Sequence, residues 1–264
     1  MRAYGEIVKI YAKSKLMWRE DIFLNLLAMI MRIVFASLLW GTVFGSYDTL
    51  AGFTYQSMLA YYVIHSFLTK LDKSDQISWA VSEGIRNGSF FKYMILPARA
   101  DYYFWAMDIG TMIPHFVPGV ILVLGSLITL GISEAVIIDA ELIFSAVIMI
   151  CLGLLFMAQL NYFIGLLAFK YQDVSVFLMI KKNFLSLING SIIPLILFPE
   201  IFTDILRWLP FYYVSYLPSM LLIGRGRMEI LQGMAVLMIW NIVMKVLSEV
   251  TYEKYRVKYD GVGL

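Results

Sequence analysis

The sequence predicts an all-α integral membrane protein, a single transmembrane domain over residues 1–264 with six spanning helices. Of its 264 residues, 61% are hydrophobic and only 15% are charged. Soluble domains are closer to half apolar and a quarter charged. The hydrophobic residues also gather in long runs. A spanning helix needs roughly 20 mostly apolar residues, which runs of this kind supply.

Residues 1–21 predict an amphipathic helix lying in the membrane interface. Tyr4, Ile7, Val8 and Tyr11 recur at helical spacing, and the charged residues fall elsewhere on the helical wheel. The first apolar run starts only around Ile22 with no small-residue cleavage site after it, so we expect no signal peptide. A frayed cytoplasmic tail is the alternative interpretation of this segment.

Hydropathy indicates six spans. They cover residues 22–44, 53–68, 103–130, 142–169, 176–198 and 230–250. Most Lys and Arg residues precede the first span, follow the last, or fall between spans two and three and between spans four and five. The positive-inside rule then places both termini in the cytoplasm. The loop between spans five and six disagrees, because it holds Arg207, Arg225 and Arg227 and must lie outside.

Few charged residues fall within the spans. Asp108, Lys245 and Glu249 lie near cytoplasmic ends, where a long side chain can reach the interface. Arg32 lies deeper, in the first span. Intramembrane charge is costly and often functional, so Arg32 is a candidate for lining a pathway or a seam between subunits. The alternatives are an arginine whose side chain extends to the interface and a misjudged boundary of the span.

The loop over residues 69–101 predicts a short amphipathic helix with a sharp end. Ser74 or Asp75 is suited to cap its start. An apolar face follows at helical spacing, and Asn87-Gly88 is a good helix stop, since both residue types tolerate the left-handed conformation. A second apolar stretch, from Phe90 to Leu96, follows this helix stop. We expect one face to press on the membrane domain and the tip to meet a cytoplasmic partner, or else a solvated helix without one.

The loop over residues 199–229 predicts short helices that dip back into the membrane on the outer side. Three prolines divide it, and its aromatic residues are suited to the interface. Pro199 is suited to a helix start. An ordinary interfacial helix is the alternative. Irregular backbone at this depth requires protein or water around it.

The sequence contains no phosphate loop of the form GxxxxGK[ST], so it predicts no ATP hydrolysis by that route. It shows no basic tract for nucleic acid. One cysteine, Cys151, and two distant histidines indicate neither a disulfide framework nor a metal site. No set of nucleophile, base and orienting group stands out, so we expect no enzyme activity in this chain.

Two segments resemble the permeases of ABC-2-type transporters, in particular a branch of short six-span bacterial permeases. They are ISWAVSEGIRNGSFFKYMILPARADYYFWA over residues 77–106 and SLINGSIIPLILFPEIFTDILRWLPFYYVSYLPSMLLIGR over residues 186–225. In that family the first segment holds a coupling helix that docks on an ATPase subunit. The second holds the end of span five and re-entrant helices that form an outer gate.

The resemblance implies a division of labour. A separate ABC ATPase dimer would bind ATP and Mg²⁺, while this chain and a second permease chain, related or identical, would form the pathway in a bacterial inner membrane. It implies export of an amphipathic compound, drug, peptide or lipid-like molecule. Its ATPase contact would comprise Ser82, Glu83, Gly84, Ile85, Arg86, Asn87, Gly88, Phe90 and Phe91. Its outer gate would comprise Pro199, Phe202, Trp208, Pro210 and Tyr213.

Three other functions stay open on the sequence. A secondary transporter driven by an ion gradient would need polar groups converging in mid-membrane, where only Arg32 is a fair candidate. A non-transporting membrane scaffold predicts that no ATPase co-purifies. A membrane enzyme acting on lipid would need a site that the sequence does not offer.

Overall fold

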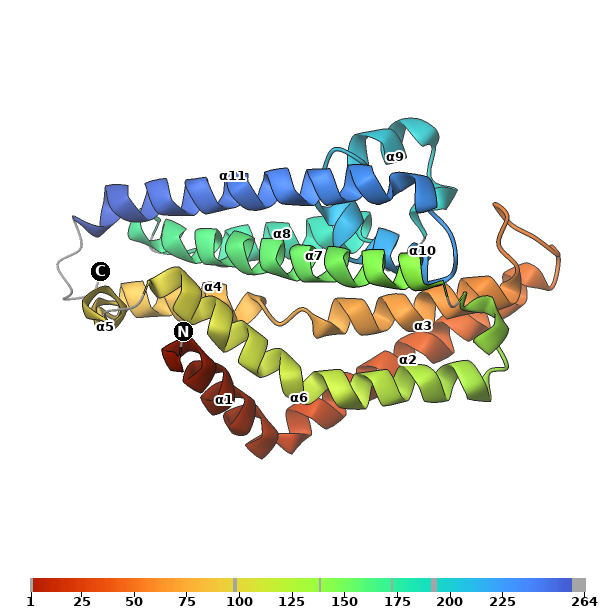
Figure 1. Cartoon of the computed structure of the whole chain (residues 1–264), viewed down its shortest axis with the longest axis horizontal. Coiled ribbons are helices and arrows are strands. Elements are labelled where there is room, and N and C mark those ends of the chain that lie inside the picture. The colour runs from red at the N-terminus through yellow and green to blue at the C-terminus, as the bar shows by residue number, and fades with distance from the viewer. Residues whose placement is uncertain (1, 97–98, 138, 172, 191–193, 258–264) are drawn as a thin grey trace.

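The structure, a computed structural model, describes residues 2–257 except 97–98, 138, 172 and 191–193. These residues form helices joined by loops, and the one β pairing among them is an isolated bridge between Leu50 and Phe53. The helices form an elongated bundle in which the N-terminal helix and the last turns of the C-terminal helix lie toward the same end (Figure 1). We call this the hook end and the opposite one the far end.

Among the described residues, four helices are long and apolar enough to cross a membrane. They are α2 (Arg19–Phe44), α6 (Ala100–Thr129), α7 (Ala140–Leu166) and α11 (Ile230–Arg256). A 3-10 turn extends α7 from Leu167 to Phe169, and another precedes α11 from Arg227 to Glu229. These helices lie where spans one, three, four and six are predicted. The chain is therefore a multi-pass membrane protein.

The other two predicted spans correspond to shorter helices. α3 (Tyr55–Leu71) has 17 residues and α8 (Ser175–Ile188) has 14. At 1.5 Å per residue they reach about 26 Å and about 21 Å, short of a bilayer core of about 30 Å. The expectation of one helix over 176–198 is wrong in its second half, because α8 ends at Ile188. Residues 191–193 lie outside the described part of the chain.

Gly190 explains why α8 stops where it does. Its φ is +74°, a conformation that favours glycine. A Cβ at this position would lie 2.5 Å from the Tyr61 hydroxyl, which donates a hydrogen bond to the Gly190 carbonyl at 3.0 Å. The Asn189-Gly190 pair therefore turns the chain against α3.

α3 and α7 form the interior of the bundle. Residues 58–66 of α3 are all buried, because α2 packs on one side and α10 (Leu217–Leu222) on another. α7 packs against α11, α4 (Asp75–Arg86) and α10. α2, in contrast, leaves Phe35 and Leu38 about two-thirds exposed. An apolar face of this kind suits lipid or a second membrane chain.

α6 changes direction near its middle (Figure 1), where Pro114 and Pro118 lie inside the helix. Proline removes a backbone hydrogen bond and crowds the preceding turn, which accounts for the bend. The first half of α6 packs against α1 (Arg2–Met17), the helix that the sequence predicts within residues 1–21. The Tyr11 and Tyr103 hydroxyls lie 3.0 Å apart across this contact.

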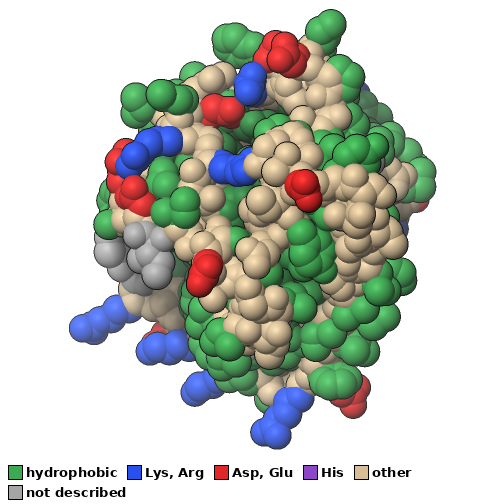
Figure 2. All heavy atoms as spheres, turned by 90° about the vertical axis from the view of Figure 1, so that its right-hand side faces the viewer, with side chains coloured by type: hydrophobic (Ala, Val, Ile, Leu, Met, Phe, Trp, Pro, Cys, Tyr) green, Lys and Arg blue, Asp and Glu red, His purple; other side chains and the backbone are tan. Residues whose placement is uncertain are grey.

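Short elements at the far end include α9 (Glu200–Leu206), a π-helical turn (Tyr212–Tyr216) and α10. Residues 217–221 are all buried, so this part of the predicted outer loop lies within the bundle. Figure 2 shows the far end with acidic and basic side chains set among apolar ones.

Candidate functional site

The segment of residues 74–96, which we call the hook, is built from α4 and α5 (Phe91–Ile95). The apolar face predicted for α4 is buried, with Ile77, Val81 and Ile85 each fully inaccessible. This face packs on α7 at Gly165, where an added Cβ would lie 2.7 Å from Cβ of Val81. Glycine at this position lets the two helices approach closely, so the hook is fixed to the bundle.

The predicted polar side of α4 is only partly exposed. Ser78 and Ser82 are buried, and their hydroxyls donate to carbonyls of their own helix, from Asp75 at 2.7 Å and Trp79 at 3.2 Å. A small hydroxyl satisfied in this way can lie against another helix without an unpaired polar group. The buried face of α4 therefore includes these two serines as well as the apolar residues.

The hook turns sharply after α4, as the sequence predicts. Gly88 has a φ of +78°, and the Phe90 amide donates to the Gly84 carbonyl at 2.8 Å, closing the turn. The Asn87 side-chain carbonyl accepts from the Ser89 amide at 3.0 Å. Phe90 is thereby inserted into the core, where its ring lies 6.3 Å from that of Phe104.

The nine residues of the expected ATPase contact divide into two groups. Five are buried within this chain: Ser82, Gly84, Ile85, Gly88 and Phe90. Four are exposed and form what we call the hook tip: Glu83, Arg86, Asn87 and Phe91. Phe91 is 52% exposed, so of the two phenylalanines only Phe90 is inserted into the core and anchors the hook. Trp79, which the sequence reasoning left out, is also half-exposed on α4.

A polar network fixes the base of the hook. Neither Ser74 nor Asp75 caps α4 with its side chain. Instead the Ser74 hydroxyl donates to Asp72 at 2.6 Å and accepts from the Asn161 amide of α7 at 2.6 Å. Lys181 of α8 donates to the Asn161 carbonyl at 2.5 Å and forms an ion pair with Asp75. Burial raises the pKa of Asp72. A shift of α4 would therefore act directly on α7 and α8.

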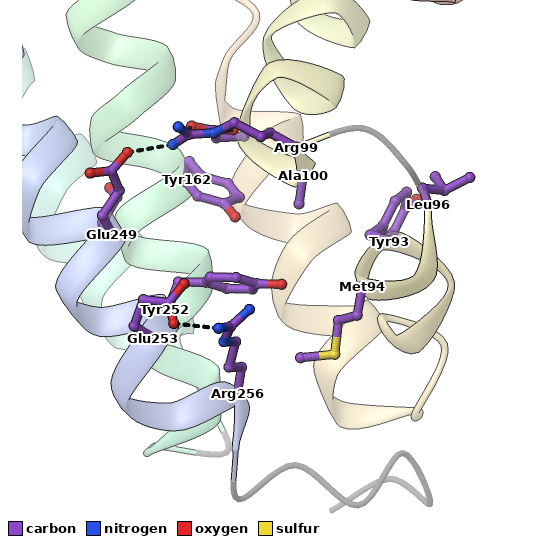
Figure 3. A pocket seen from close by; sticks show the side chains of 12 residues that line it. Tyr93, Met94, Leu96, Arg99, Ala100, Tyr162, Glu249, Tyr252, Glu253 and Arg256 are labelled. Atoms are coloured by element: carbon purple, nitrogen blue, oxygen red, sulfur yellow. Dashed lines mark hydrogen bonds and ion pairs between the residues drawn. The ribbon is translucent and has the colours of Figure 1, made fainter.

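A cavity of about 620 Å³ lies between the end of the hook, the start of α6, and the last turns of α11 (Figure 3). At its edge, Arg99 donates to Asp101 at 3.1 Å and forms an ion pair with Glu249. The hydrogen bond to Glu249 raises the pKa of the Arg99 guanidinium above its usual value. Lys245 forms an ion pair with the same Asp101. The exit of the hook is thereby tied to α11.

The expected outer-gate residues lie at the far end in differing environments. Pro199 precedes α9 and is exposed, and the half-buried Phe202 ring stacks 5.1 Å from that of Phe198. Pro210 and Tyr213 are buried, and the Tyr213 hydroxyl donates to the Arg207 carbonyl at 2.9 Å.

Trp208, the fifth expected gate residue, is 74% exposed. Its carbonyl accepts from the Trp240 indole of α11 at 3.1 Å. The structure thus gathers these residues where span five would lead into span six.

The three arginines that conflict with the positive-inside rule all have partners at the far end. Arg207 donates to Asp204 at 2.7 Å and to Glu229 at 3.1 Å. Arg227 lies between two carboxylates of the preceding far-end loop and helix, Asp139 at 3.0 Å and Glu141 at 2.5 Å.

Arg225 donates to the Gly52 carbonyl, and its guanidinium lies 4.0 Å from the centre of the Phe53 ring.

Arg32 of α2 donates to the Thr69 hydroxyl of α3 at 3.1 Å. No carboxylate lies within salt-bridge distance of it in the part of the chain that the structure describes. The sequence predicts that Arg32 lies deep in the first span. In the structure, the Arg32 side chain contacts α3, and no carboxylate of the described residues pairs with it.

Sequence reasoning missed the links made by Asn161, Lys181 and Asp101. Each lies in or beside an apolar run, and polar residues within such runs are the signal that could have found them. Within the described ranges, no group of three or more His, Cys, Asp or Glu residues is placed to hold a metal ion.

The family model described as ABC-2 family transporter protein matches residues 26–263 of the chain, which is most of its length. A search of curated proteins finds no match.

Proposed function

The chain belongs to the ABC-2 family of transporter proteins, and on that basis we propose that it is the exporting permease subunit of an ATP-driven complex whose ATPase binds the hook. Family membership makes it a membrane permease of an ABC transporter. The proposal adds three properties to this family assignment: the direction of export, the dimer of permease chains, and the coupling to the ATPase through the hook.

The hook carries this proposal. One face of α4 is buried on α7, whereas Glu83, Arg86, Asn87 and Phe91 point away from the bundle. A segment that is rigidly fixed on one side and exposed on the other can transmit a push from a bound protein. ATP and Mg²⁺ would be held by the partner ATPase, and closure of its two subunits would move the hook tip.

Two ties would carry this motion into the membrane. The Asp75–Lys181 pair joins α4 to α8, and Arg99 with Asp101 joins the hook exit to α11. In the proposed cycle the hook tilts the helices of spans one, two and five. The far-end elements α9 and α10 then act as the outer gate.

We further propose that two permease chains, related or identical, enclose the pathway. The exposed apolar face of α2 supports a partner in the membrane, because the described part of the chain leaves Phe35 and Leu38 about two-thirds exposed. Six spans, cytoplasmic termini and a bacterial inner membrane complete the proposed arrangement.

The test is a double variant of the hook tip, Glu83→Ala with Arg86→Ala, in cells from which an ATPase co-purifies with the unmodified chain. We expect the ATPase to be lost from the purified complex, or its hydrolysis to become uncoupled from transport, while insertion is unchanged. The matched control is Glu6→Ala with Lys9→Ala, an exposed acid–base pair of the same spacing on α1. It should retain coupling.

The rival functions predict other results. A membrane scaffold predicts that no ATPase co-purifies even with the unmodified chain. A transporter driven by an ion gradient predicts transport that persists in both double variants and stops when the gradient is collapsed. Unchanged ATPase capture and transport in the hook variant would contradict the assignment of the hook tip.

A further inference from the structure

A second cavity, of about 370 Å³, lies between α2, α3, α7 and α8, close to the base of the hook. Its wall is strongly basic. Two carboxylates line it, Asp72 and Asp75. Five cationic side chains line it: Arg32, Lys70, Lys73, Lys181 and Lys182.

The two carboxylates are already engaged. Asp75 pairs with Lys181, and Asp72 accepts from the Ser74 amide at 3.0 Å and hydroxyl at 2.6 Å. Lys73 donates to the neutral Asn25 side chain at 3.1 Å.

Among the described residues, no carboxylate lies within 4 Å of the cationic atoms of Arg32, Lys70 or Lys182. Among the described residues that line the cavity, five cationic side chains therefore face two carboxylates, which leaves an excess of positive charge.

Such an excess is costly where the charged groups are partly buried. Of the cations without a carboxylate partner, Arg32 and Lys70 are half-buried, and Arg32 has a single hydroxyl partner, Thr69. Charged groups at membrane depth are normally paired or bound to a charged ligand. The guanidinium of Arg32 has four N–H groups left over, in a planar arrangement that fits phosphate or carboxylate oxygens.

Part of the cavity wall is apolar. It comprises Leu68, Met157, Leu185, Phe211 and Val214. A free inorganic anion would gain nothing from this apolar part. A molecule with a charged head and a hydrocarbon tail would match both the basic and the apolar lining.

We propose that this cavity binds the phosphate or carboxylate head of an anionic amphiphile, with the tail of that molecule against the apolar wall. Two sources share this chemistry, a transported cargo and a lipid of the bilayer. The site itself stands apart from the proposed transport function. Identifying its occupant as the cargo rests on that function.

The experiment uses the full-length chain in nanodiscs of zwitterionic phosphatidylcholine and dodecyl phosphate as the probe. Calorimetric titration, corrected with empty nanodiscs, should show saturable binding. Arg32→Gln should weaken this binding about tenfold or more, as expected when a charge-assisted contact is lost. Lys13→Gln removes an equal charge from an exposed site on α1 and should leave affinity unchanged within about twofold.

Competition titrations against dodecyl phosphate then identify the occupant of the cavity. Dodecyltrimethylammonium should not compete, and inorganic phosphate should compete only at a far higher concentration than the probe. Competition by phosphatidylglycerol added to the nanodiscs would support the site and assign it to a bilayer lipid. Persistence of probe binding in its presence would support a cargo that is not a bilayer lipid.

Absent binding, equal effects of Arg32→Gln and Lys13→Gln, or equal competition by inorganic phosphate would each overturn the proposal. If Arg32→Gln is not monodisperse on size exclusion, Lys182→Gln replaces it, with a smaller expected loss of about threefold because Lys182 is exposed. The titration needs no ATPase. Failure of ATPase capture with binding retained would therefore overturn the transport function and leave the site in place.

Discussion

At the far end, Arg207 and Arg227 each lie between two carboxylates. Near the hook, Arg32, Lys70 and Lys182 line a cavity and form no ion pair with a carboxylate of the described residues. The far-end arginines hold parts of the chain together, whereas these three cations have no such structural partner in the described part of the chain. This difference indicates that charges at the far end stabilise the fold and that those near the hook are available to a ligand. The following predictions test this contrast in order of decreasing effect.

Arg207→Gln should destabilise the protein most. The Glu229 side chain is only 21% exposed, and the substitution leaves it without its cation. Breaking a fully buried pair costs about 3–5 kcal/mol, and partial exposure of Arg207 reduces this to about 2 kcal/mol. We expect the Tm of the purified protein to fall by about 4–8 °C. A Tm unchanged within 1 °C would remove the structural role assigned to the far-end pairs.

Lys73 should make stability depend on pH. Burial lowers the pKa of Lys73 to about 8 from 10.5, against a raising effect of Asp21 and a further lowering by Lys70. Below pH 8 the folded and unfolded states are both protonated, and the cost of burying the charge is present in full. Between pH 8 and pH 10.5 only the unfolded state holds the proton, so rising pH stabilises the fold.

Lys73→Gln should therefore increase the free energy of unfolding at pH 7 by on the order of 1–2 kcal/mol, seen as a higher Tm, and this gain should shrink toward pH 10. Thermal unfolding of both proteins at the two pH values measures it, with Lys13→Gln as the control for a charge lost from α1. A gain that is the same at both pH values would show that the Lys73 ammonium is not buried at the edge of the cavity.

Arg227→Gln should cost less than Arg207→Gln. The side chains of Arg227 and Glu141 are 54% and 64% exposed, and exposed pairs contribute up to about 1 kcal/mol. Salt screens such pairs, so the difference in Tm between this variant and the unmodified protein should decrease between 0.1 M and 1 M NaCl. A difference that grows with salt would contradict the pairing.

Arg32→Gln should have the smallest effect on stability. It breaks one hydrogen bond to a neutral hydroxyl, and it also removes an unpaired charge from a half-buried position. These effects oppose each other, so we expect Tm to stay within about 2 °C of the unmodified value. A fall as large as that of Arg207→Gln would place Arg32 among the structural cations and weaken the contrast between the two regions.

Hydropathy was sufficient to place the four long helices, because an apolar run of the required length is a local property of the sequence. It misplaced the end of α8. The same dipeptide, Asn-Gly, ends α4 at 87–88 and follows α8 at 189–190. The first was recognised because polar residues surround it. The second lies in an apolar run, where hydropathy continues past a left-handed glycine that ends the helix.

In the hook, too, some features can be predicted from the local sequence and others cannot. The turn and the apolar face follow from local spacing, and both are present in the structure. The burial of Ser82 and the links from Ser74 to Asn161 depend on α7, which lies far along the chain. Pairs such as Arg227 with Asp139 likewise join distant segments. No spacing rule within one sequence reveals such pairs, because only tertiary packing brings them together.

The most direct test of the account is a cross-link from the hook tip. In a Cys151→Ser background, Glu83→Cys provides a thiol at the exposed side of α4, and Ile201→Cys provides a control thiol on exposed α9. We predict that a bifunctional thiol–amine reagent joins position 83, and not position 201, to a nucleotide-binding protein in native membranes. Capture of no such protein at position 83, or equal capture at both positions, would contradict the claim that the hook receives the ATPase.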